Sequence, residues 1–319
     1  MPRFSIIMPL YNKAPYVRKA VESVVGQTYT DWDLWVIDDG STDGSGEVVK
    51  AIDDSRIHFY RQENAGVGTA RNRGVALSGE AAFRSPYLCF LDADDWWEPT
   101  FLEKMAGLIE RHPDAGIYGT SYYIVKNSKK RIAPIGVDKG FIEGEINYCK
   151  VYAQTLCMPL TSISVCIPRN MFDEAGGFPT KIKLGEDFIL WTHVALKHKV
   201  VLLNKPLCNY NQDVDATYRG THHLHAPEHN MLWHLKDLEP LEQTNPDYKQ
   251  LIDNLRTYSL MNYLLDYRYS SPAQQELAKV DWGRQPNSVK HLYQRPLWML
   301  RLRRSFLKNA SQIKQMLYK

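Results

Sequence analysis

The sequence predicts an α/β protein in which a sheet-containing amino-terminal domain is followed by a mainly helical carboxy-terminal region. Strand-like and helical patterns alternate over the first hundred residues, which is typical of parallel βαβ units. Polar clusters follow three of the strand-like runs, at the edge where open α/β sheets bind ligands. Strand signals then fade from about residue 222, so we expect a first domain over residues 1–225 and a second over residues 226–319.

The order of elements follows from apolar runs and the turns between them. Strands are expected at residues 3–8, 33–37, 57–60, 87–91, 117–125 and 161–167. Helices are expected at residues 15–25, 48–52, 69–77, 229–238, 248–269 and 296–318. A turn and two polar loops, which carry some of the polar clusters, are expected at residues 9–12, 38–46 and 64–68.

Composition excludes several classes of protein. With 44% hydrophobic residues the chain is too apolar for disorder, and no apolar run approaches the roughly 20 residues of a transmembrane helix. We expect no secretion signal. The five cysteines form no CxxC pair and include an odd one, which favours a reduced compartment over a disulfide framework. The sequence therefore predicts a cytoplasmic protein.

The loop after the first strand excludes the common nucleotide-binding motifs. Residues 9–12 read Pro-Leu-Tyr-Asn and lack the glycines of a dinucleotide fingerprint, and no P-loop occurs. Residues 66–71 match only the first half of that fingerprint, because Arg71 stands where the third glycine is needed. A bound diphosphate must therefore be neutralised by a metal ion or by basic side chains.

An acidic cluster over residues 92–95 follows the fourth strand and forms the candidate metal site. In an extended segment Asp92 and Asp94 point to the same side, and Ala93 packs behind them. Two carboxylates suit Mg²⁺ or Mn²⁺, whose remaining positions are filled by phosphate oxygens and water. The alternative is a solvated acidic turn without a metal.

Seven short segments occur in a characteristic order. They read SIIMPLYN (5–12), SVVGQT (23–28), VIDDGSTDGS (36–45), NAGVGTARNRG (64–74), FLDADD (90–95), GGF (176–178) and GED (185–187). Together they resemble the inverting family 2 glycosyltransferases, and the resemblance extends to about residue 215. It implies a GT-A-type, Rossmann-like nucleotide-binding domain with a mixed central sheet. It also implies a nucleotide diphosphate-sugar donor, most often a UDP-sugar.

The resemblance assigns roles at the donor site. Pro9 shapes the turn, Tyr11 stacks on the base and Asp39 accepts the uracil N3 proton. Arg71 either reaches the diphosphate or braces the acidic loop of residues 92–94. The structural alternatives are an aromatic lid for Tyr11, a turn carboxylate for Asp39 and a surface ion pair for Arg71. Three further polar residues are expected to serve as turn and capping residues: Ser41, Thr42 and Asp43.

Glu186 and Asp187 form the candidate catalytic pair. They precede an apolar run and are expected in the first turn of a helix, where the helix dipole favours carboxylates for structural reasons alone. By the resemblance, Asp187 is the general base that takes the acceptor hydroxyl proton, and Glu186 positions the acceptor or substitutes for the base. The implied reaction is a single displacement without a covalent enzyme intermediate, in which the metal at Asp92 and Asp94 stabilises the departing diphosphate.

The sequence departs from the family pattern after the last core strand. Family members often place a metal-coordinating histidine there, but residues 210–215 read Tyr-Asn-Gln-Asp-Val-Asp. His222, His223 and His225 lie downstream, either as a metal- or phosphate-binding cluster or as surface histidines. We expect the surface arrangement and leave them out of the metal site.

The end of the chain is basic. Residues 290–319 carry eight Lys and Arg and no Asp or Glu. The whole chain has a net charge of +3, so the remaining residues have a net charge of −5. A helix over residues 296–319 has two possible roles. It either makes peripheral contact with the inner face of an anionic membrane, or completes the core of the carboxy-terminal domain or a homodimer interface. No nucleic-acid-binding motif accompanies the basic residues, and we expect no nucleic acid partner.

The predicted function is a metal-dependent inverting glycosyltransferase that moves a sugar from a UDP-sugar to a glycan or lipid-linked acceptor in surface polysaccharide biosynthesis. One alternative is a protein that binds nucleotide sugars without turnover and needs no base at Asp187. The other is a nucleotidyltransferase, which usually has a Gly-rich, basic phosphate loop after the first strand.

Overall fold

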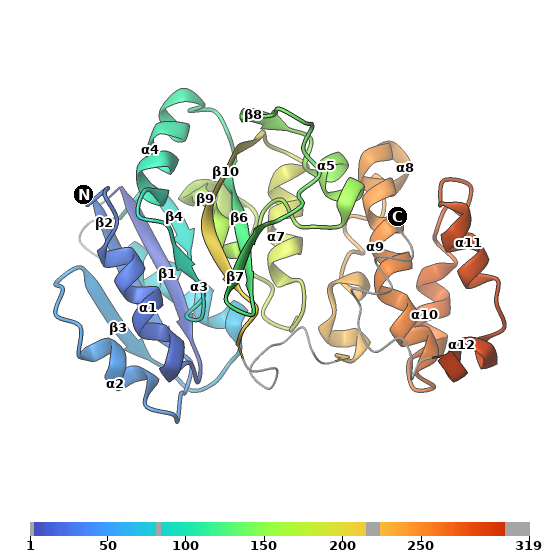
Figure 1. Ribbon diagram of the computed structural model, residues 1–319, viewed down its shortest axis with the longest axis horizontal. Coiled ribbons are helices and arrows are strands. Elements are labelled where there is room, and N and C mark those ends of the chain that lie inside the picture. The colour runs from blue at the N-terminus through green and yellow to red at the C-terminus, as the bar shows by residue number, and fades with distance from the viewer. Residues whose placement is uncertain (1–2, 81–83, 215–223, 304–319) are drawn as a thin grey trace.

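The computed structural model describes residues 3–80, 84–214 and 224–303, and confirms a mixed α/β protein with a helical carboxy-terminal region (Figure 1). The described strands are β1 (Phe4–Leu10), β2 (Trp32–Asp38), β3 (Ile57–Arg61), β4 (Tyr87–Phe90), β5 (Trp96–Trp97), β6 (Ile117–Lys126), β7 (Lys129–Ile132), β8 (Glu143–Ile146), β9 (Val165–Pro168) and β10 (Val200–Asn211). These described strands form one ten-stranded sheet in the order β3-β2-β1-β4-β9-β6-β10-β5, with β7 paired to β6 and β8 to β10.

The strand directions place the polar loops together. β1 pairs in parallel with β2 and β4, and β2 pairs in parallel with β3. β9 runs antiparallel between β4 and β6, so the sheet is mixed as the resemblance implies. Because the carboxyl ends of β1, β2 and β4 meet at one edge, the loops that carry Tyr11, Asp39 and Asp92 are neighbours.

The predicted turn at residues 9–12 begins too early. β1 continues through Pro9 and Leu10, which lie opposite Ile37 and Asp38 of β2. β4 pairs with β1 only as far as Ile7. Pro9 therefore lies near the end of the strand, where a missing N–H is tolerated, and the turn starts at Tyr11.

Helices cover the sheet and form the end of the described chain. They are α1 (Ala14–Val25), α2 (Ser45–Lys50), α3 (Val67–Glu80), α4 (Phe101–Arg111), α5 (Tyr148–Thr155), α6 (Arg169–Glu174), α7 (Glu186–Ala195), α8 (Leu241–Thr244), α9 (Pro246–Leu265), α10 (Ser270–Leu277), α11 (Asn287–Tyr293) and α12 (Leu297–Arg303). In α1, Val17, Ala20, Val21 and Val24 share one buried face at helical spacing, and the helix ends at Gly26.

Two predicted elements differ in the structure. Residues 229–238 do not form one helix but contain parts of two short 3₁₀ turns, Pro227–His229 and Met231–Trp233. Asn230 separates them, because its side chain accepts a hydrogen bond from the Leu232 amide and so caps the second turn. The predicted strand at residues 161–167 starts with a 3₁₀ turn, Ser162–Ser164, before β9.

The carboxy-terminal helices lie at one end of the molecule and share its core (Figure 1). α9 packs against α5 and α10, and buried residues of α9 belong to the same apolar cluster as the sheet. The domain boundary near residue 225 stays a prediction. The tail helix is described only as α12, because residues 304–319 lie outside the described part of the chain. In the described residues, every helix is too short or too polar to cross a membrane.

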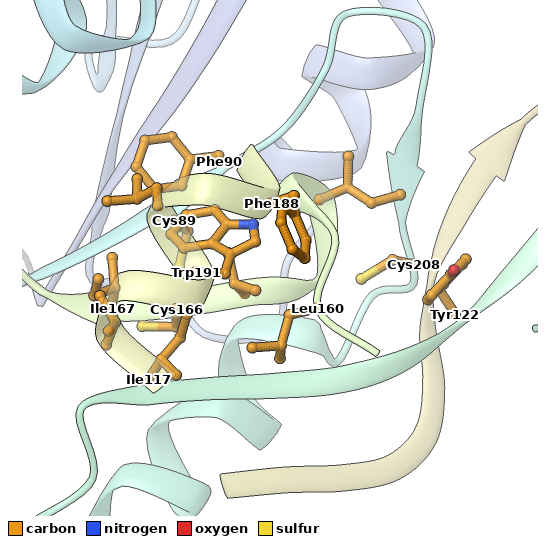
Figure 2. Packing of buried hydrophobic residues seen from close by; sticks show 14 of the residues in the cluster. Cys89, Phe90, Ile117, Tyr122, Leu160, Cys166, Ile167, Phe188, Trp191 and Cys208 are labelled. Carbon is orange, nitrogen blue, oxygen red and sulfur yellow. The ribbon is translucent and has the colours of Figure 1, made fainter. Parts of the chain in front are cut away.

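The core fixes α7 against β4. Figure 2 shows the indole of Trp191 in α7 near Phe90 and Cys89 of β4. The ring centroids of Trp191 and Phe90 are 5.9 Å apart, and those of Trp191 and Phe178 are 5.6 Å apart. Since β4 leads directly into the acidic loop, the contact between Trp191 and Phe90 positions the start of α7 relative to that loop.

All five cysteines are free and buried, in agreement with the expected absence of a disulfide framework.

Candidate active site

Hydrogen bonds join the loop after β1 to the loop after β2. The Asn12 amide donates to Ser41 Oγ at 3.0 Å, and the Ala14 amide donates to Asp43 Oδ2 at 2.9 Å. The Thr42 amide returns a bond to Asn12 Oδ1 at 2.8 Å. Asn12 has a φ of 50°, a conformation that asparagine tolerates better than most residues. The side chains of Ser41 and Asp43 therefore make turn contacts, and Thr42 contributes its backbone amide. The N-cap of α2 is Gly44, so none of the three is the helix N-cap that was expected.

Tyr11 and Asp39 lie at the ends of neighbouring strands in contrasting environments. Tyr11 is 49% exposed and is therefore accessible to a ligand. Asp39 is buried, and its Oδ1 accepts from Gln62 Nε2 at 2.8 Å and from the Ala65 amide at 2.9 Å. Its Oδ2 accepts from the Gly66 amide at 2.8 Å. A carboxylate offers about four acceptor positions, so these three bonds leave room for one further donor.

These contacts explain the glycine-containing loop before α3. Its backbone amides point at Asp39 rather than forming a phosphate cradle. Gly66 adopts a φ of 91°, in the left-handed region that favours glycine. The loop thus fixes the carboxylate expected to recognise the base.

Arg71 bridges the acidic loop and the candidate catalytic pair. Its Nη2 donates to Asp92 Oδ1 at 2.7 Å, and its Nη1 donates to Glu186 Oε1 at 2.8 Å. The guanidinium is 3% exposed and lies over the Phe178 ring, 5.0 Å from its centroid. Burial opposes its charge, but the carboxylates of Asp92, Glu186 and Asp187 outweigh burial and raise the pKa of Arg71. Of the two roles expected for Arg71, the contacts are those of a brace.

The Gly-Gly-Phe segment also docks onto α3. Asn72 Oδ1 accepts from the Phe178 amide at 2.9 Å, and Asn72 Nδ2 donates to the Phe178 carbonyl at 2.8 Å. Gly177 has a φ of 74°, and a Cβ there would lie 2.9 Å from Asn72 Oδ1. A larger residue at 177 would therefore disturb the contact between this segment and α3.

The acidic loop is a turn, which corrects the expected extended segment. The Asp95 amide donates to the Asp92 carbonyl at 3.0 Å, and Ala93 is buried behind the loop as predicted. Asp94 Oδ2 forms an ion pair with Lys13 at 2.6 Å, whereas Asp92 pairs with Arg71. Burial and the charge of Asp92 raise the pKa of Asp94, against the opposing effect of Lys13.

Asp95 turns inward. Its carboxylate accepts from the Asn211 amide at 2.7 Å, and Asn211 Nδ2 donates to the Asp94 carbonyl at 3.1 Å. Burial raises the pKa of Asp95 well above its ordinary value, and the charges of Asp94 and Asp92 add to this effect. Asp95 therefore anchors the loop to β10 and is not a candidate ligand.

The acidic loop fits a divalent cation held by two carboxylates. Each of Asp92 and Asp94 uses one oxygen in its ion pair, and the second oxygen of each would be the one to hold the ion. Among the described residues no group of three His, Cys, Asp or Glu side chains gathers as a metal site. The remaining ligands would come from the diphosphate and water, which is the usual arrangement for Mg²⁺.

Glu186 and Asp187 begin α7, as predicted. Asp187 is half-buried, and its Oδ1 accepts from the Phe188 amide at 2.8 Å. Burial raises the pKa of Asp187 to about 7; the charges of Glu186 and Asp92 add to the rise, and Arg71 opposes it. A carboxylate with a pKa near neutral pH is well matched to general-base catalysis.

The histidines of the linker are only partly described. His222 and His223 lie outside the described residues. The His225 carbonyl accepts a hydrogen bond from the Tyr263 hydroxyl at 2.8 Å, which is a structural contact with α9.

Sequence reasoning missed Lys13 and Asn211 as parts of this site. Lys13 directly follows Tyr11 and Asn12, but nothing in the sequence pairs it with Asp94, 81 residues further on. Asn211 ends β10, where the expectation concerned a metal-binding histidine. The signal for Lys13 was its place at the start of α1, close to the edge where the strands end.

Comparison with known proteins establishes the family. The family described as Glycosyl transferase family 2 matches residues 5–166, half of the chain. The chain belongs to glycosyl transferase family 2. Glycosyltransferase GlyA of Streptococcus pneumoniae is 33% identical over 223 residues, which cover 65% of this chain and 30% of GlyA. The putative teichuronic acid biosynthesis glycosyltransferase TuaG of Bacillus subtilis is 37% identical over 106 residues, covering 32% of this chain and 40% of TuaG. This chain therefore spans about a third of the length of GlyA.

Solved structures share the fold at low sequence identity. S. aureus TarS, residues 1–349 in complex with UDP-GlcNAc, has a TM-score of 0.60 and 16% identity, covering 99% of this chain and 84% of that one. The mannosyltransferase PcManGT from Pyrobaculum calidifontis, in complex with GDP-Man and Mn²⁺, has a TM-score of 0.52 and 15% identity, covering 98% and 87%. The fold is the GT-A type that the sequence resemblance implies.

Proposed function

We propose that the protein is a metal-dependent inverting glycosyltransferase that moves a sugar from a UDP-sugar to a hydroxyl of a glycan or lipid-linked acceptor. Family membership supports glycosyl transfer. The observation that carries the mechanism is the bridge of Arg71 between Asp92 and Glu186. This one guanidinium joins Asp92, one of the two candidate metal ligands, to Glu186, the neighbour of the candidate base. The name of the relative TuaG supports a place in surface polysaccharide biosynthesis.

Donor recognition rests on Tyr11 and Asp39. The exposed ring of Tyr11 stacks on the base, and Asp39 accepts the N3 proton of uracil at its remaining acceptor position. Cytosine lacks that proton and would leave the position unfilled. Because three fixed donors already orient Asp39, little reorganisation accompanies nucleotide binding.

The diphosphate is held next to the acidic loop. Asp92 and Asp94 would hold Mg²⁺ or Mn²⁺ through the oxygens that Arg71 and Lys13 do not contact. Such an ion supplies stabilisation of the negative charge that develops on the departing diphosphate. Lys13 adds a positive charge beside Asp94, and Arg71 fixes the direction of Asp92. The presence of Mn²⁺ in the structure of PcManGT supports this choice of ion.

Asp187 takes the proton of the acceptor hydroxyl as that oxygen attacks the anomeric carbon of the donor sugar. The bond between the sugar and the diphosphate breaks in the same step, so the configuration inverts. Glu186, held by Arg71, orients the acceptor beside Asp187. General-base catalysis of this kind contributes about 10² to 10⁴ in rate.

The test measures donor binding and turnover separately. UDP, GDP, CDP and ADP are compared by thermal shift with and without Mn²⁺, and we expect selective stabilisation by UDP with Mn²⁺. UDP release from UDP-sugars is then compared between the wild type and Asp187→Asn. UDP release no faster than the uncatalysed rate in both proteins would indicate a binding protein without a catalytic base. Absence of stabilisation by every nucleotide would refute the proposal.

A further inference from the structure

A cavity of about 370 Å³ opens beside the acidic loop, on the side of α1. Its walls come from α1, from the acidic loop with β5, from the β6–β7 hairpin and from the end of β10. Asp94 lines it at the acidic loop, and Trp96, Lys19 and Lys130 line it further along. Its volume lies in the range of roughly 300–1,000 Å³ that is usual for small-molecule sites.

Two lysines converge on one indole in this cavity. Lys19 Nζ lies 3.0 Å from the centroid of the Trp96 ring. Lys130 Nζ lies 6.0 Å from the Trp96 centroid and 5.1 Å from that of Tyr123. Lys130 also pairs with Glu98 at 2.7 Å. Within the described part of the chain, no carboxylate lies within 4.0 Å of the Lys19 ammonium.

Two ammonium groups therefore lie close to Trp96, and of the two Lys130 is the one that has a carboxylate partner among the described residues. Partial burial lowers the pKa of Lys19, and the nearby charge of Lys130 lowers it further, whereas Glu98 opposes this effect. A negatively charged ligand group close to both ammonium groups would relieve their repulsion and accept hydrogen bonds from them.

The carboxylates that line the cavity are already engaged by other groups. Asp94 pairs with Lys13, and Asp95 accepts from the Asn211 amide. Asp213 accepts from the amides of the turn between β6 and β7, at Asn127 and Ser128. Lys130 likewise pairs with Glu98, so Lys19 is the lysine of the cavity that has no oppositely charged side chain within 4.0 Å among the described residues.

We propose that this cavity binds an anionic saccharide, a sugar unit that carries a carboxylate or a phosphate, as part of the acceptor. The anionic group lies near Lys19 and Lys130, and the sugar ring lies against the aromatic walls formed by Trp96 and Tyr16. The acceptor role rests on the proposed function, because the cavity borders the acidic loop where the donor diphosphate is expected. The cavity itself is defined by the described residues alone.

The experiment uses the full chain and defined probes. Binding of p-nitrophenyl β-D-glucuronide and of glucose 6-phosphate is measured by ligand-detected NMR titration, and each is compared with its neutral counterpart, p-nitrophenyl β-D-glucoside or glucose. We expect at least one anionic probe to bind at least tenfold more tightly than its counterpart. The probe that does so distinguishes a carboxylate from a phosphate ligand.

A matched pair of variants tests the lysines. Lys19→Gln should weaken binding of the anionic probe at least tenfold without changing binding of the neutral probe. The double variant with Lys130→Gln should weaken binding of the anionic probe further. Lys50→Gln is the control, because Lys50 Nζ also lies over an aromatic ring, 4.8 Å from the Phe59 centroid, but outside the cavity. Equal binding of anionic and neutral probes, or unchanged binding in Lys19→Gln, would overturn the proposal.

A further titration separates this site from the donor site. Saturating UDP with Mn²⁺ should leave the binding of the anionic probe intact, since the two ligands occupy neighbouring sites. Competition between them, with UDP affinity reduced in Lys19→Gln, would show that the cavity holds the donor diphosphate and would overturn the acceptor assignment. If UDP does not bind at all, the proposed function fails, while the probe titrations still decide whether the cavity binds an anionic saccharide.

Discussion

Arg71 Nη1 donates to Glu186 Oε1 at 2.8 Å, joining the start of α3 to the start of α7 across the edge of the sheet. The same guanidinium contacts Asp92 in the acidic loop. A single buried cation therefore connects the two acidic segments on which the proposed reaction depends.

Arg71→Met should destabilise the protein strongly. Removing one partner of a buried ion pair leaves uncompensated charge and typically costs about 3–5 kcal/mol of unfolding free energy. Arg71→Lys should recover only part of this loss, because one ammonium cannot reproduce two separate guanidinium contacts. Urea denaturation measures both. Arg84→Met is the control, since Arg84 and its partner Asp173 are exposed, and it should unfold like the wild type. A wild-type unfolding curve for Arg71→Met would contradict the role of Arg71 as a brace.

Asp187→Asn should lower kcat by about 10² to 10⁴ while leaving UDP affinity unchanged, because the amide keeps the shape of the side chain but cannot take a proton at neutral pH. Steady-state UDP release and UDP titration give the two quantities. Asp173→Asn, a change at an exposed carboxylate on α6, is the matched control. Undiminished turnover in Asp187→Asn would assign the proton transfer to another group.

The pKa of about 7 at Asp187 predicts the pH dependence of the reaction. The base must be deprotonated, so kcat should fall about tenfold per pH unit as the pH drops below 7. Between the ordinary pKa of 3.8 and 7 the folded state binds more protons at this site than the unfolded state does. The contribution of Asp187 to the unfolding free energy is therefore largest at low pH and is lost as the pH rises to 7. Asp187→Asn should remove this contribution, which denaturation at pH 5 and pH 8 would detect.

Asp94→Asn should abolish the tightening of UDP binding by Mn²⁺, because it removes a metal-ligating charge. Calorimetric titration of UDP with Mn²⁺ and with EDTA measures this effect in the variant and the wild type. Asp213→Asn provides a control in the same region, since that carboxylate binds the amides of a hairpin turn. The assignment of Asp94 fails if the variant retains the full response to Mn²⁺.

Trp191→Ala should cost about 3–5 kcal/mol of unfolding free energy, the usual loss when a large aromatic side chain is removed from a core. Trp191→Phe should cost less, because it keeps an aromatic contact with Phe90 and removes an indole N–H that has no hydrogen-bond partner among the described residues. Trp298, which is 63% exposed, offers the control variant Trp298→Ala. Thermal unfolding compares the three.

The sequence predicted which loops meet at this edge of the sheet, because the positions of these loops follow from local patterns. Tyr11 and Asp39 follow the ends of neighbouring parallel strands, and the alternation of elements brings such ends together without further information. The start of α7 at Glu186 was likewise predictable from adjacent residues. Whether Tyr11, Asp39 and Asp187 perform the roles assigned to them stays a prediction.

The remaining contacts depend on tertiary structure. Arg71 and Glu186 are 115 residues apart, and no periodicity relates them. The acidic loop was expected to be extended, but tertiary contacts turn Asp95 toward β10 and place Asp94 beside Lys13. Residues 229–238 were expected to be one helix, and the local cap at Asn230 divides them.

The contact between Trp191 and Phe90 also determines which parts of the site can change independently. The start of α7 and the acidic loop are attached to opposite sides of this aromatic contact, so the packing of core residues sets the distance between them. The β6–β7 hairpin and the carboxy-terminal helices lie outside that contact. Changes in those outer parts can therefore alter the surroundings of the site while this contact keeps the start of α7 and the acidic loop in place.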